Sequence, residues 1–146
     1  MYITRHTDYA LRVLMYLALK DGETATVGEI AGQFGISRHH LTKVVHRLNR
    51  TGHLSATRGK NGGLALCRPP GEIILGEVFR DLENELGLVE CMREDGACLL
   101  DDGCELKRTF DQAMAAFLAV LDDRSLADLL PATKVDHLRD ILAIAP

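Results

Sequence analysis

The segment TVGEIAGQFGISRHHLTKVVHRLNR, residues 26–50, contains the pattern on which the fold prediction depends. Thr26 and Glu29 stand three residues apart, which is the spacing of a capping box and predicts the start of a helix. Gly35 supplies a tight turn, and Ser37 is expected to cap a second helix that runs to the end of the segment. Two short helices joined by a glycine-containing turn are typical of a helix-turn-helix. Packed helix pairs in other all-α domains share this pattern, so the DNA-binding interpretation also depends on the flanking sequence.

A β-hairpin is predicted directly after the second helix. Residues 52–57 and 64–67 are expected to form its strands, and the tip Arg-Gly-Lys-Asn-Gly-Gly spans residues 58–63. A hairpin in this position is typical of the wing of a winged helix-turn-helix, and a plain surface hairpin is the alternative. Cations at the tip suit the electronegative minor groove of DNA. The predicted wing contacts are Arg58, Lys60 and Asn61.

The second helix of the pair is predicted to read the major groove, because polar residues gather at its N-terminus. The residues expected to face base edges are Ser37, Arg38, His39 and His40, and the DNA-binding residues expected nearby are Thr42 and Lys43. Among them, Arg38 suits a guanine, which an arginine binds through two hydrogen bonds. The residues expected to contact phosphates are His46, Arg47 and Arg50. For each residue taken alone, a solvated surface role is the alternative.

Charge is distributed unevenly along the chain. The formal net charge is −4, but residues 1–70 carry 10 Lys and Arg against 4 Asp and Glu. Residues 71–146 carry 7 Lys and Arg against 17 Asp and Glu, and five of the six histidines lie in the first half. This asymmetry favours a phosphate-binding face in the first half. Chance segregation of solvated charges is the alternative.

Apolar residues at helical spacing predict further helices, one over residues 7–20 and a long one over residues 105–121. The apolar positions of the long helix are Leu106, Phe110, Ala113, Phe117 and either Val120 or Leu121. A late amphipathic helix of this kind is a good dimerisation element, so a homodimer is expected. The predicted fold class is mainly α with a small β-hairpin wing. The predicted regions are a winged helix-turn-helix DNA-binding domain (1–80), a cysteine loop region (81–104), and the dimerisation helix with a C-terminal tail (105–146).

Three of the four cysteines lie in CMREDGACLLDDGC, residues 91–104. Six residues separate Cys91 from Cys98 and five separate Cys98 from Cys104, which matches neither a C-x-x-C zinc knuckle nor a thioredoxin motif. Three thiolates on one glycine-containing loop favour a soft-metal site, and an iron–sulfur cluster there would need a fourth ligand from elsewhere. Three unrelated buried thiols are the alternative. Cys67 is expected to be a small packing residue of the wing strand.

The sequence shows neither a run of 18 apolar residues nor a signal-peptide pattern. We therefore expect no membrane association and a cytoplasmic location. Cysteines in that compartment are more often thiols, metal ligands or redox centres than structural disulfides. No general acid–base pair stands out, so the protein is not expected to be an enzyme.

The chain resembles the IscR/NsrR/RirA family of winged helix-turn-helix iron–sulfur transcriptional regulators, and within it the NsrR-like members. The resemblance covers residues 1 to about 130. It rests on TDYALR at residues 7–12, the helix pair at 29–48, the wing RGKNGG, the three-cysteine loop and SLADL at 125–129. The wing and the cysteine loop together are a highly specific combination.

This resemblance implies a cofactor and its ligands. Cys91, Cys98 and Cys104 match cluster ligands, and Asp8 matches the position that supplies an oxygen ligand from the partner subunit. A 4Fe-4S cluster is favoured over a 2Fe-2S cluster. The IscR branch uses a histidine as a ligand at the position where this chain has Lys107. A carboxylate is a hard ligand that would leave its iron labile, which suits a sensor.

The resemblance also implies a function. The expected protein is a homodimeric repressor that binds double-stranded operator DNA and is released when nitric oxide nitrosylates or removes the cluster. Three alternatives stay open, namely an iron- or redox-responsive regulator of the RirA or IscR kind, a zinc-stabilised regulator, and an iron–sulfur electron-transfer module. The last of these would need neither a wing nor a basic half.

Overall fold

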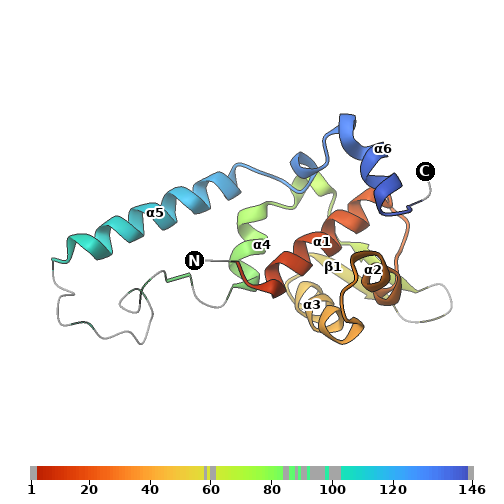
Figure 1. Ribbon diagram of the computed structural model, residues 1–146, viewed down its shortest axis with the longest axis horizontal. Coiled ribbons are helices and arrows are strands. Elements are labelled where there is room, and N and C mark those ends of the chain that lie inside the picture. The colour runs from red at the N-terminus through yellow and green to blue at the C-terminus, as the bar shows by residue number, and fades with distance from the viewer. Residues whose placement is uncertain are drawn as a thin grey trace.

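The computed structural model describes residues 3–57, 59, 62–83, 86–87, 89, 92, 98 and 103–144. Its elements are α1 (Arg5–Leu19), α2 (Val27–Phe34), α3 (Arg38–Arg50), β1 (Leu54–Thr57), β2 (Gly63–Leu66), η1 (Pro70–Glu72), α4 (Leu75–Leu82), α5 (Glu105–Asp122), η3 (Ala127–Leu129) and α6 (Ala132–Ile141). The described part of the chain is mainly helical and carries one two-stranded sheet (Figure 1). The predicted fold class is therefore confirmed.

The helix pair α2–α3 begins and turns largely as its sequence predicts. Thr26 Oγ1 accepts the Glu29 N–H at 3.1 Å, and Glu29 Oε2 accepts the Thr26 N–H at 3.3 Å, which completes the capping box. Gly35 follows α2 with a φ of 62°, a left-handed conformation that glycine adopts without strain. Ser37 stands at the N-cap of α3, but its side chain makes no cap hydrogen bond. Ser37 is therefore the N-cap residue that the sequence predicts, although its hydroxyl does not bond to the first turn.

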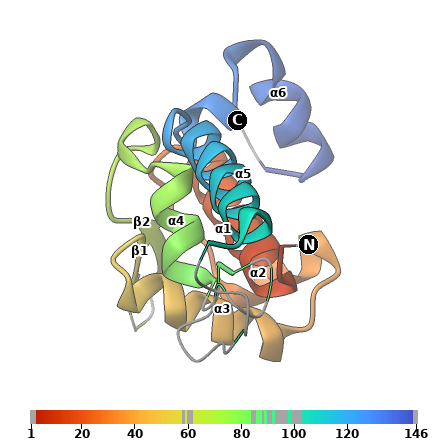
Figure 2. The ribbon, with the colours of Figure 1, turned by 90° about the vertical axis from the view of Figure 1, so that its left-hand side faces the viewer.

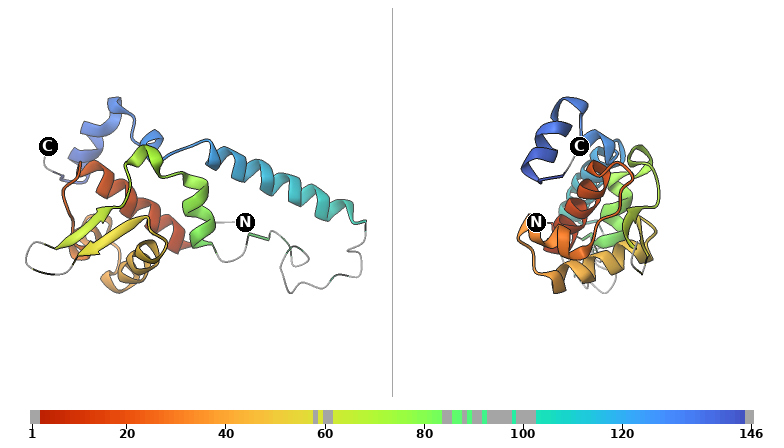
Figure 3. Two further views of the ribbon diagram at one scale, coloured as in Figure 1. Left: turned by 180° about the vertical axis from the view of Figure 1, so that it is seen from behind. Right: turned by 90° about the vertical axis from the view of Figure 1, so that its right-hand side faces the viewer.

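The hairpin follows α3 directly, and Figure 3 shows its two strands from behind. The antiparallel register pairs Leu54 with Leu66, Ser55 with Ala65, Ala56 with Leu64 and Thr57 with Gly63. Leu54 and Leu64 are buried, and Leu64 also pairs with Ala25 in an isolated bridge. The first strand is shorter than predicted, because Gly52 has a φ of 77° and belongs to the turn that ends α3.

The core lies between α1 and the helix pair. Ala10, Val13 and Leu14 of α1 and Leu41 and Leu48 of α3 all have no exposed surface. Because these residues take up the inward faces of both helices, the opposite face of α3 carries its polar side chains into solvent. The core therefore fixes which side of α3 is available to a partner.

Helix α5 extends away from the rest of the molecule and lies against α4 near its C-terminal end (Figures 1 and 2). Phe79 of α4 contacts Phe117 of α5 edge to face, with ring centroids 5.2 Å apart. Met114 is the one buried residue of α5, and it keeps 9% of its surface exposed. Leu106 is 61% exposed and Val120 is 64% exposed, although both belong to the predicted apolar stripe.

The C-terminal part returns to the body of the molecule. Leu126 has no exposed surface, and its N–H donates to the carbonyl of buried Ile73 at 2.8 Å. Arg139 of α6 donates from Nε to the carbonyl of Leu19, the last residue of α1, at 3.0 Å. Among the described residues, no helix is both long and apolar enough to cross a membrane.

Candidate DNA-binding surface and cysteine site

The residues predicted to read DNA share the solvent face of α3. The predicted base-reading and phosphate-contacting side chains exposed there are Ser37, Arg38, His39, His40, Thr42, Lys43, His46 and Arg50. The two histidine rings at positions 39 and 40 lie beside each other, with centroids 6.1 Å apart. The structure thus brings these residues together on one accessible surface, and their contacts with DNA stay a prediction. The three predicted wing contacts, Arg58, Lys60 and Asn61, lie outside the described residues.

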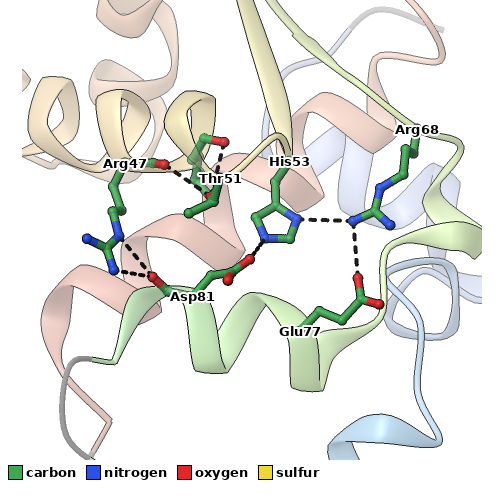
Figure 4. A network of polar contacts seen from close by, with 7 residues as sticks. Arg47, Thr51, His53, Arg68, Glu77 and Asp81 are labelled. Carbon is green, nitrogen blue, oxygen red and sulfur yellow. Dashed lines mark hydrogen bonds and ion pairs between the residues drawn. The ribbon is translucent and has the colours of Figure 1, made fainter.

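Arg47 differs from the other cations of α3 because it faces the protein. Its Nε and Nη2 donate to the carbonyl oxygen of Asp81 at 2.9 and 2.6 Å (Figure 4). Asp81 lies in the last turn of α4, so this contact joins the recognition helix to the end of α4. A phosphate contact by Arg47 stays a prediction, but two of its five N–H donors already serve this link.

A buried histidine extends the same link. His53 is 1% exposed, and its Nε2 lies 2.6 Å from Oδ2 of Asp81. Its Nδ1 lies 3.4 Å from an Nη2 of Arg68, which also donates to Glu77 at 3.2 Å. Figure 4 shows this network crossing from the hairpin to α4. A buried imidazole needs partners for its ring nitrogens, and here Asp81 supplies the closest one.

The residue that follows α4 makes a second link, to the start of α1. Glu83 Oε1 accepts the N–H of Thr4 at 3.0 Å and its hydroxyl at 2.9 Å. Thr4 is the N-cap of α1 and accepts the Thr7 N–H at 3.3 Å. Between the two links lies His6, whose pKa is lowered by burial and by the charge of Arg47, while Glu83 opposes this shift. The end of α4 therefore holds both α3 and α1.

Asp8 lies one turn into α1, and its carboxylate is paired with Arg12. Arg12 Nε donates to Oδ1 at 3.1 Å and Nη2 lies 3.0 Å from Oδ2, so both oxygens are engaged. The guanidinium of Arg12 also lies over the ring of Phe34, 5.9 Å from its centroid. The Asp8 side chain stays 46% exposed, so its carboxylate is oriented yet accessible from outside the protomer.

The cysteine site is described only in part. Cys91 lies outside the described residues. Cys98 is exposed, Cys104 is half-buried at the N-cap of α5, and both are free thiols. Within the described residues, no group of three His, Cys, Asp or Glu side chains is close enough to hold a metal ion.

Cys67 does not have its predicted packing role. It follows the end of β2 and is exposed, where it borders a cavity of about 330 Å³ together with residues of α1. Its N–H still donates to the carbonyl of His53 at 3.2 Å, but Cys67 lies an odd number of residues after buried Leu64, so its side chain is on the opposite face of the hairpin. The prediction that Cys67 is a small packing residue is therefore wrong.

Comparisons with known proteins agree on the class of the chain. The family described as "Rrf2: Iron-dependent Transcriptional regulator" matches residues 3–132. The HTH-type transcriptional regulator NsrR of Geobacillus kaustophilus is 46% identical over 132 residues, which cover 89% of this chain and 90% of that protein. NsrR of Bacillus licheniformis is 40% identical over 145 residues, covering 98% and 100% of the two chains.

The solved structures give the same result. CymR, the global cysteine regulator of B. subtilis, superposes with a TM-score of 0.73 at 30% identity and covers 88% of this chain and 95% of its own. A transcriptional regulator of Listeria innocua has a TM-score of 0.73 at 29% identity, with 89% and 86% coverage. The family match spans residues 3–132 and so includes both the helix-turn-helix and the hairpin. The chain belongs to the Rrf2 family of transcriptional regulators and is a regulator of the NsrR type.

Proposed function

We propose that the protein is a homodimeric repressor that binds operator DNA and senses nitric oxide through an iron–sulfur cluster. One observation carries the proposal. The end of α4, where the cysteine segment begins, is hydrogen-bonded both to the recognition helix and to the N-cap of α1. A structural change in the cysteine loop region (81–104) would therefore be passed through these hydrogen bonds to the surface predicted to bind DNA. We assign the chain no enzymatic activity, and its place of action is the cytoplasm, where bacterial DNA lies.

The DNA partner is supported by charge and exposure. The solvent face of α3 presents Arg38, Lys43 and Arg50 beside three histidines, and its apolar residues are buried on the other side. Cations on one exposed helix face bind the phosphate backbone, and a recognition helix in the major groove reads base edges. The homodimer is supported by α5, whose exposed Leu106 and Val120 leave an apolar face for a second copy to cover.

The chemistry of the donor set fits an iron–sulfur cluster. Cys91, Cys98 and Cys104 would supply thiolates, and the two that the structure describes are free thiols within seven residues of each other. Asp8 of the partner subunit would supply the remaining oxygen, and we favour a 4Fe-4S cluster over a 2Fe-2S cluster. When bound, the cluster supplies iron that reacts with nitric oxide. Arg12 would hold the Asp8 carboxylate in one orientation, because it engages both oxygens.

The residues around α4 would carry the response to α3. Glu83 ties the start of the cysteine segment to Thr4, only four residues before Asp8. Asp81 ties the same turn to Arg47 and His53. A displacement of this turn would therefore move α1 and α3 relative to each other. Allosteric coupling through such a contact changes affinity by about 5–150-fold in typical proteins.

The test of function is operator binding by cluster-loaded protein under anaerobic conditions, before and after stoichiometric nitric oxide. Tight binding that is lost after nitric oxide is expected. Unchanged affinity would remove the sensing proposal. A variant with Cys91, Cys98 and Cys104 replaced by Ser should bind the operator weakly and not respond to nitric oxide. Wild-type behaviour by that variant would refute the proposal that a cluster controls DNA binding. Native mass spectrometry of the loaded protein distinguishes the two cluster types.

The coupling route has its own test. Glu83→Ala removes the acceptor of both Thr4 bonds, whereas Glu77→Ala removes an ion pair between α4 and Arg68 that does not involve α1. We expect Glu83→Ala to shrink the ratio of operator affinities between cluster-loaded and cluster-free protein, and Glu77→Ala to leave that ratio near the wild-type value. Equal effects of the two substitutions would show that the Thr4 link does not transmit the response.

A second candidate signal is iron itself, because the matching family is described as iron-dependent. An iron-responsive regulator would lose operator affinity when a chelator removes iron slowly, without any nitric oxide. Side-by-side titrations with chelator and with nitric oxide, under anaerobic conditions, separate the two signals. Nitric oxide is favoured as the signal if stoichiometric nitric oxide releases the operator on a time scale at which the chelator has no effect.

A further inference from the structure

A cavity of about 220 Å³ lies where the start of α1 meets α3. Figures 1 and 2 show these two segments close together at the lower part of the molecule. The cavity is lined by Arg5, His6 and Tyr9 from α1 and by His40, Lys43 and Val44 from α3. Three of these residues belong to the first turns of α1, a part of the chain for which the sequence predicted no contact with DNA. We call this site the α1–α3 cavity.

The lining of the α1–α3 cavity is suited to an anion. Arg5 and Lys43 carry permanent positive charges at neutral pH, and the remaining polar lining consists of two imidazoles and a phenol, which can all donate hydrogen bonds. None of the described residues that line the cavity is a carboxylate. Among the ion pairs formed by the described residues, none involves Arg5 or Lys43, whereas Arg12, Lys20 and other cations are paired. Two unpaired cations facing one cavity repel each other until an anion lies between them.

The backbone strengthens this preference. The cavity lies at the N-terminal turn of α1, a helix of 15 residues whose dipole places partial positive charge at that end. The Thr4 N–H at this end is bonded to Glu83 and the Thr7 N–H to Thr4, so the backbone contributes through the field of the helix dipole. Helix dipole and side-chain cations therefore act in the same direction here.

The position of the cavity selects the source of the anion. Its lining residues His40 and Lys43 are also part of the exposed face of α3 that is predicted to meet DNA. A duplex read by that face would bring its backbone alongside the recognition helix, where α1 begins. Phosphate contacts beside a recognition helix fix its register without reading sequence.

We propose that the α1–α3 cavity binds a DNA backbone phosphate next to the bases read by α3. Arg5 from α1 and Lys43 from α3 grip one phosphodiester from two sides, and Tyr9 lines the same space. This inference rests on the proposed binding of operator DNA. It adds α1 to the DNA interface, so that the helix carrying Asp8 also contacts DNA directly.

The test compares Arg5→Ala with Arg38→Ala and with Lys134→Ala, an exposed cation on α6 that serves as the matched control. Cluster-loaded protein is titrated with an operator duplex and a scrambled duplex over a range of salt concentrations. Arg5→Ala should weaken both duplexes by the same factor and lower the slope of log affinity against log salt by about 0.9 per protomer. Arg38→Ala should chiefly reduce the preference for the operator, and Lys134→Ala should change neither quantity.

Three outcomes overturn the inference, and they are distinguishable. If wild type and Arg38→Ala behave as described while Arg5→Ala keeps the wild-type slope, only the α1–α3 cavity proposal fails. If wild type shows no preference for the operator at all, the proposed function fails and the inference falls with it. A separate titration with inorganic phosphate tests a small-anion site. Phosphate binding that Arg5→Ala abolishes, with DNA affinity unchanged, would assign the cavity to a free anion instead of DNA.

Misfolding of the Arg5→Ala variant can be told apart from the loss of a phosphate contact. Arg5 is exposed in the first turn of α1, so its truncation removes no core contact, and the melting temperature of the variant should match that of wild type. Arg5→Lys keeps the charge and should restore most of the salt slope. An Arg5→Ala variant that is as stable as wild type but keeps the full wild-type salt slope contradicts the proposal.

Discussion

Removing the Asp81 carboxylate should destabilise the protein through its effect on a different residue, His53. Asp81→Ala leaves the backbone carbonyl in place, so the Arg47 contacts at 2.9 and 2.6 Å are kept. It removes the acceptor that lies 2.6 Å from Nε2 of His53, which is only 1% exposed. A buried polar group that loses its partner costs about 1–3 kcal/mol.

Two smaller effects partly offset this cost. Ala has a higher helix propensity than Asp by about 0.5 kcal/mol, and removing a negative charge from the last turn of α4 is favourable for the helix dipole. The Asp81 side chain is 42% exposed, so little apolar burial is lost with it. The expected net loss in the free energy of unfolding is therefore about 1–2 kcal/mol.

A double-mutant cycle isolates the interaction. His53→Leu replaces the imidazole with an apolar side chain of similar size, so no buried ring nitrogen is left to satisfy. In that background, Asp81→Ala should cost nothing or be slightly stabilising. The helix-propensity and dipole effects are common to both backgrounds and cancel, so the coupling free energy from the cycle should be about 1–3 kcal/mol, within the range found for residues in contact.

Urea unfolding followed by far-UV circular dichroism measures all four proteins, with cluster-free protein at one fixed concentration. The slope of the free energy against urea should be the same in each variant, because the surface exposed on unfolding does not change. A coupling free energy below about 0.5 kcal/mol would refute the argument that His53 depends on Asp81. An equal cost of Asp81→Ala in both backgrounds would refute it as well.

Three further predictions concern the dimer, the pH dependence and the α4–α5 contact. Leu106→Glu should convert the dimer to monomer in sedimentation experiments, because it places charge on the exposed apolar face of α5, whereas Ile141→Glu, at a position on α6 that is 63% exposed, should leave the dimer intact. Burial opposes the shift at Glu29, but hydrogen bonds from the Tyr16 hydroxyl, a cap N–H and a lysine outweigh it and lower the pKa of Glu29. This carboxylate therefore stabilises the fold above its unfolded pKa of about 4.5, and its contribution is lost as pH falls through the lowered value. Urea midpoints of wild type and Glu29→Gln should accordingly converge in acid, and a constant difference at all pH values would contradict this. Gly76→Ala should lower the melting temperature, because its Cβ would collide with the carboxylate of Asp122 on α5, which pairs with Arg80 of α4. An unchanged melting temperature would show that the carboxylate moves aside without loss.

The helix pair could be predicted from sequence because its signals are local. The capping box at Thr26 and Glu29 and the glycine turn at Gly35 each involve residues within a few positions of one another, and the structure has both. The exposed face of α3 also follows from the spacing of its apolar residues. The cap hydrogen bond of Ser37 could not be assigned in the same way, because a residue type suited to an N-cap does not guarantee that bond.

The polar links could not be predicted, because they join residues far apart in the sequence. His53 and Asp81 are 28 positions apart, and Thr4 and Glu83 are 79 apart. No periodic pattern marks such pairs, and each becomes visible only when α4 packs against α3 and α1. Arg47 illustrates the difficulty, since an arginine on a recognition helix favours a phosphate contact until its direction is known.

The position of Arg47 has a consequence for how regulators of this kind diverge. Arg38 and His39 are exposed on α3 and take no part in the contacts to Asp81, so exchanging them leaves the junction with α4 intact. If these positions read bases as predicted, operator preference can change there without a change in the coupling to α4. At Arg47 the link to α4 and the predicted phosphate contact would share one side chain, so a lineage that replaces Arg47 would alter both at once.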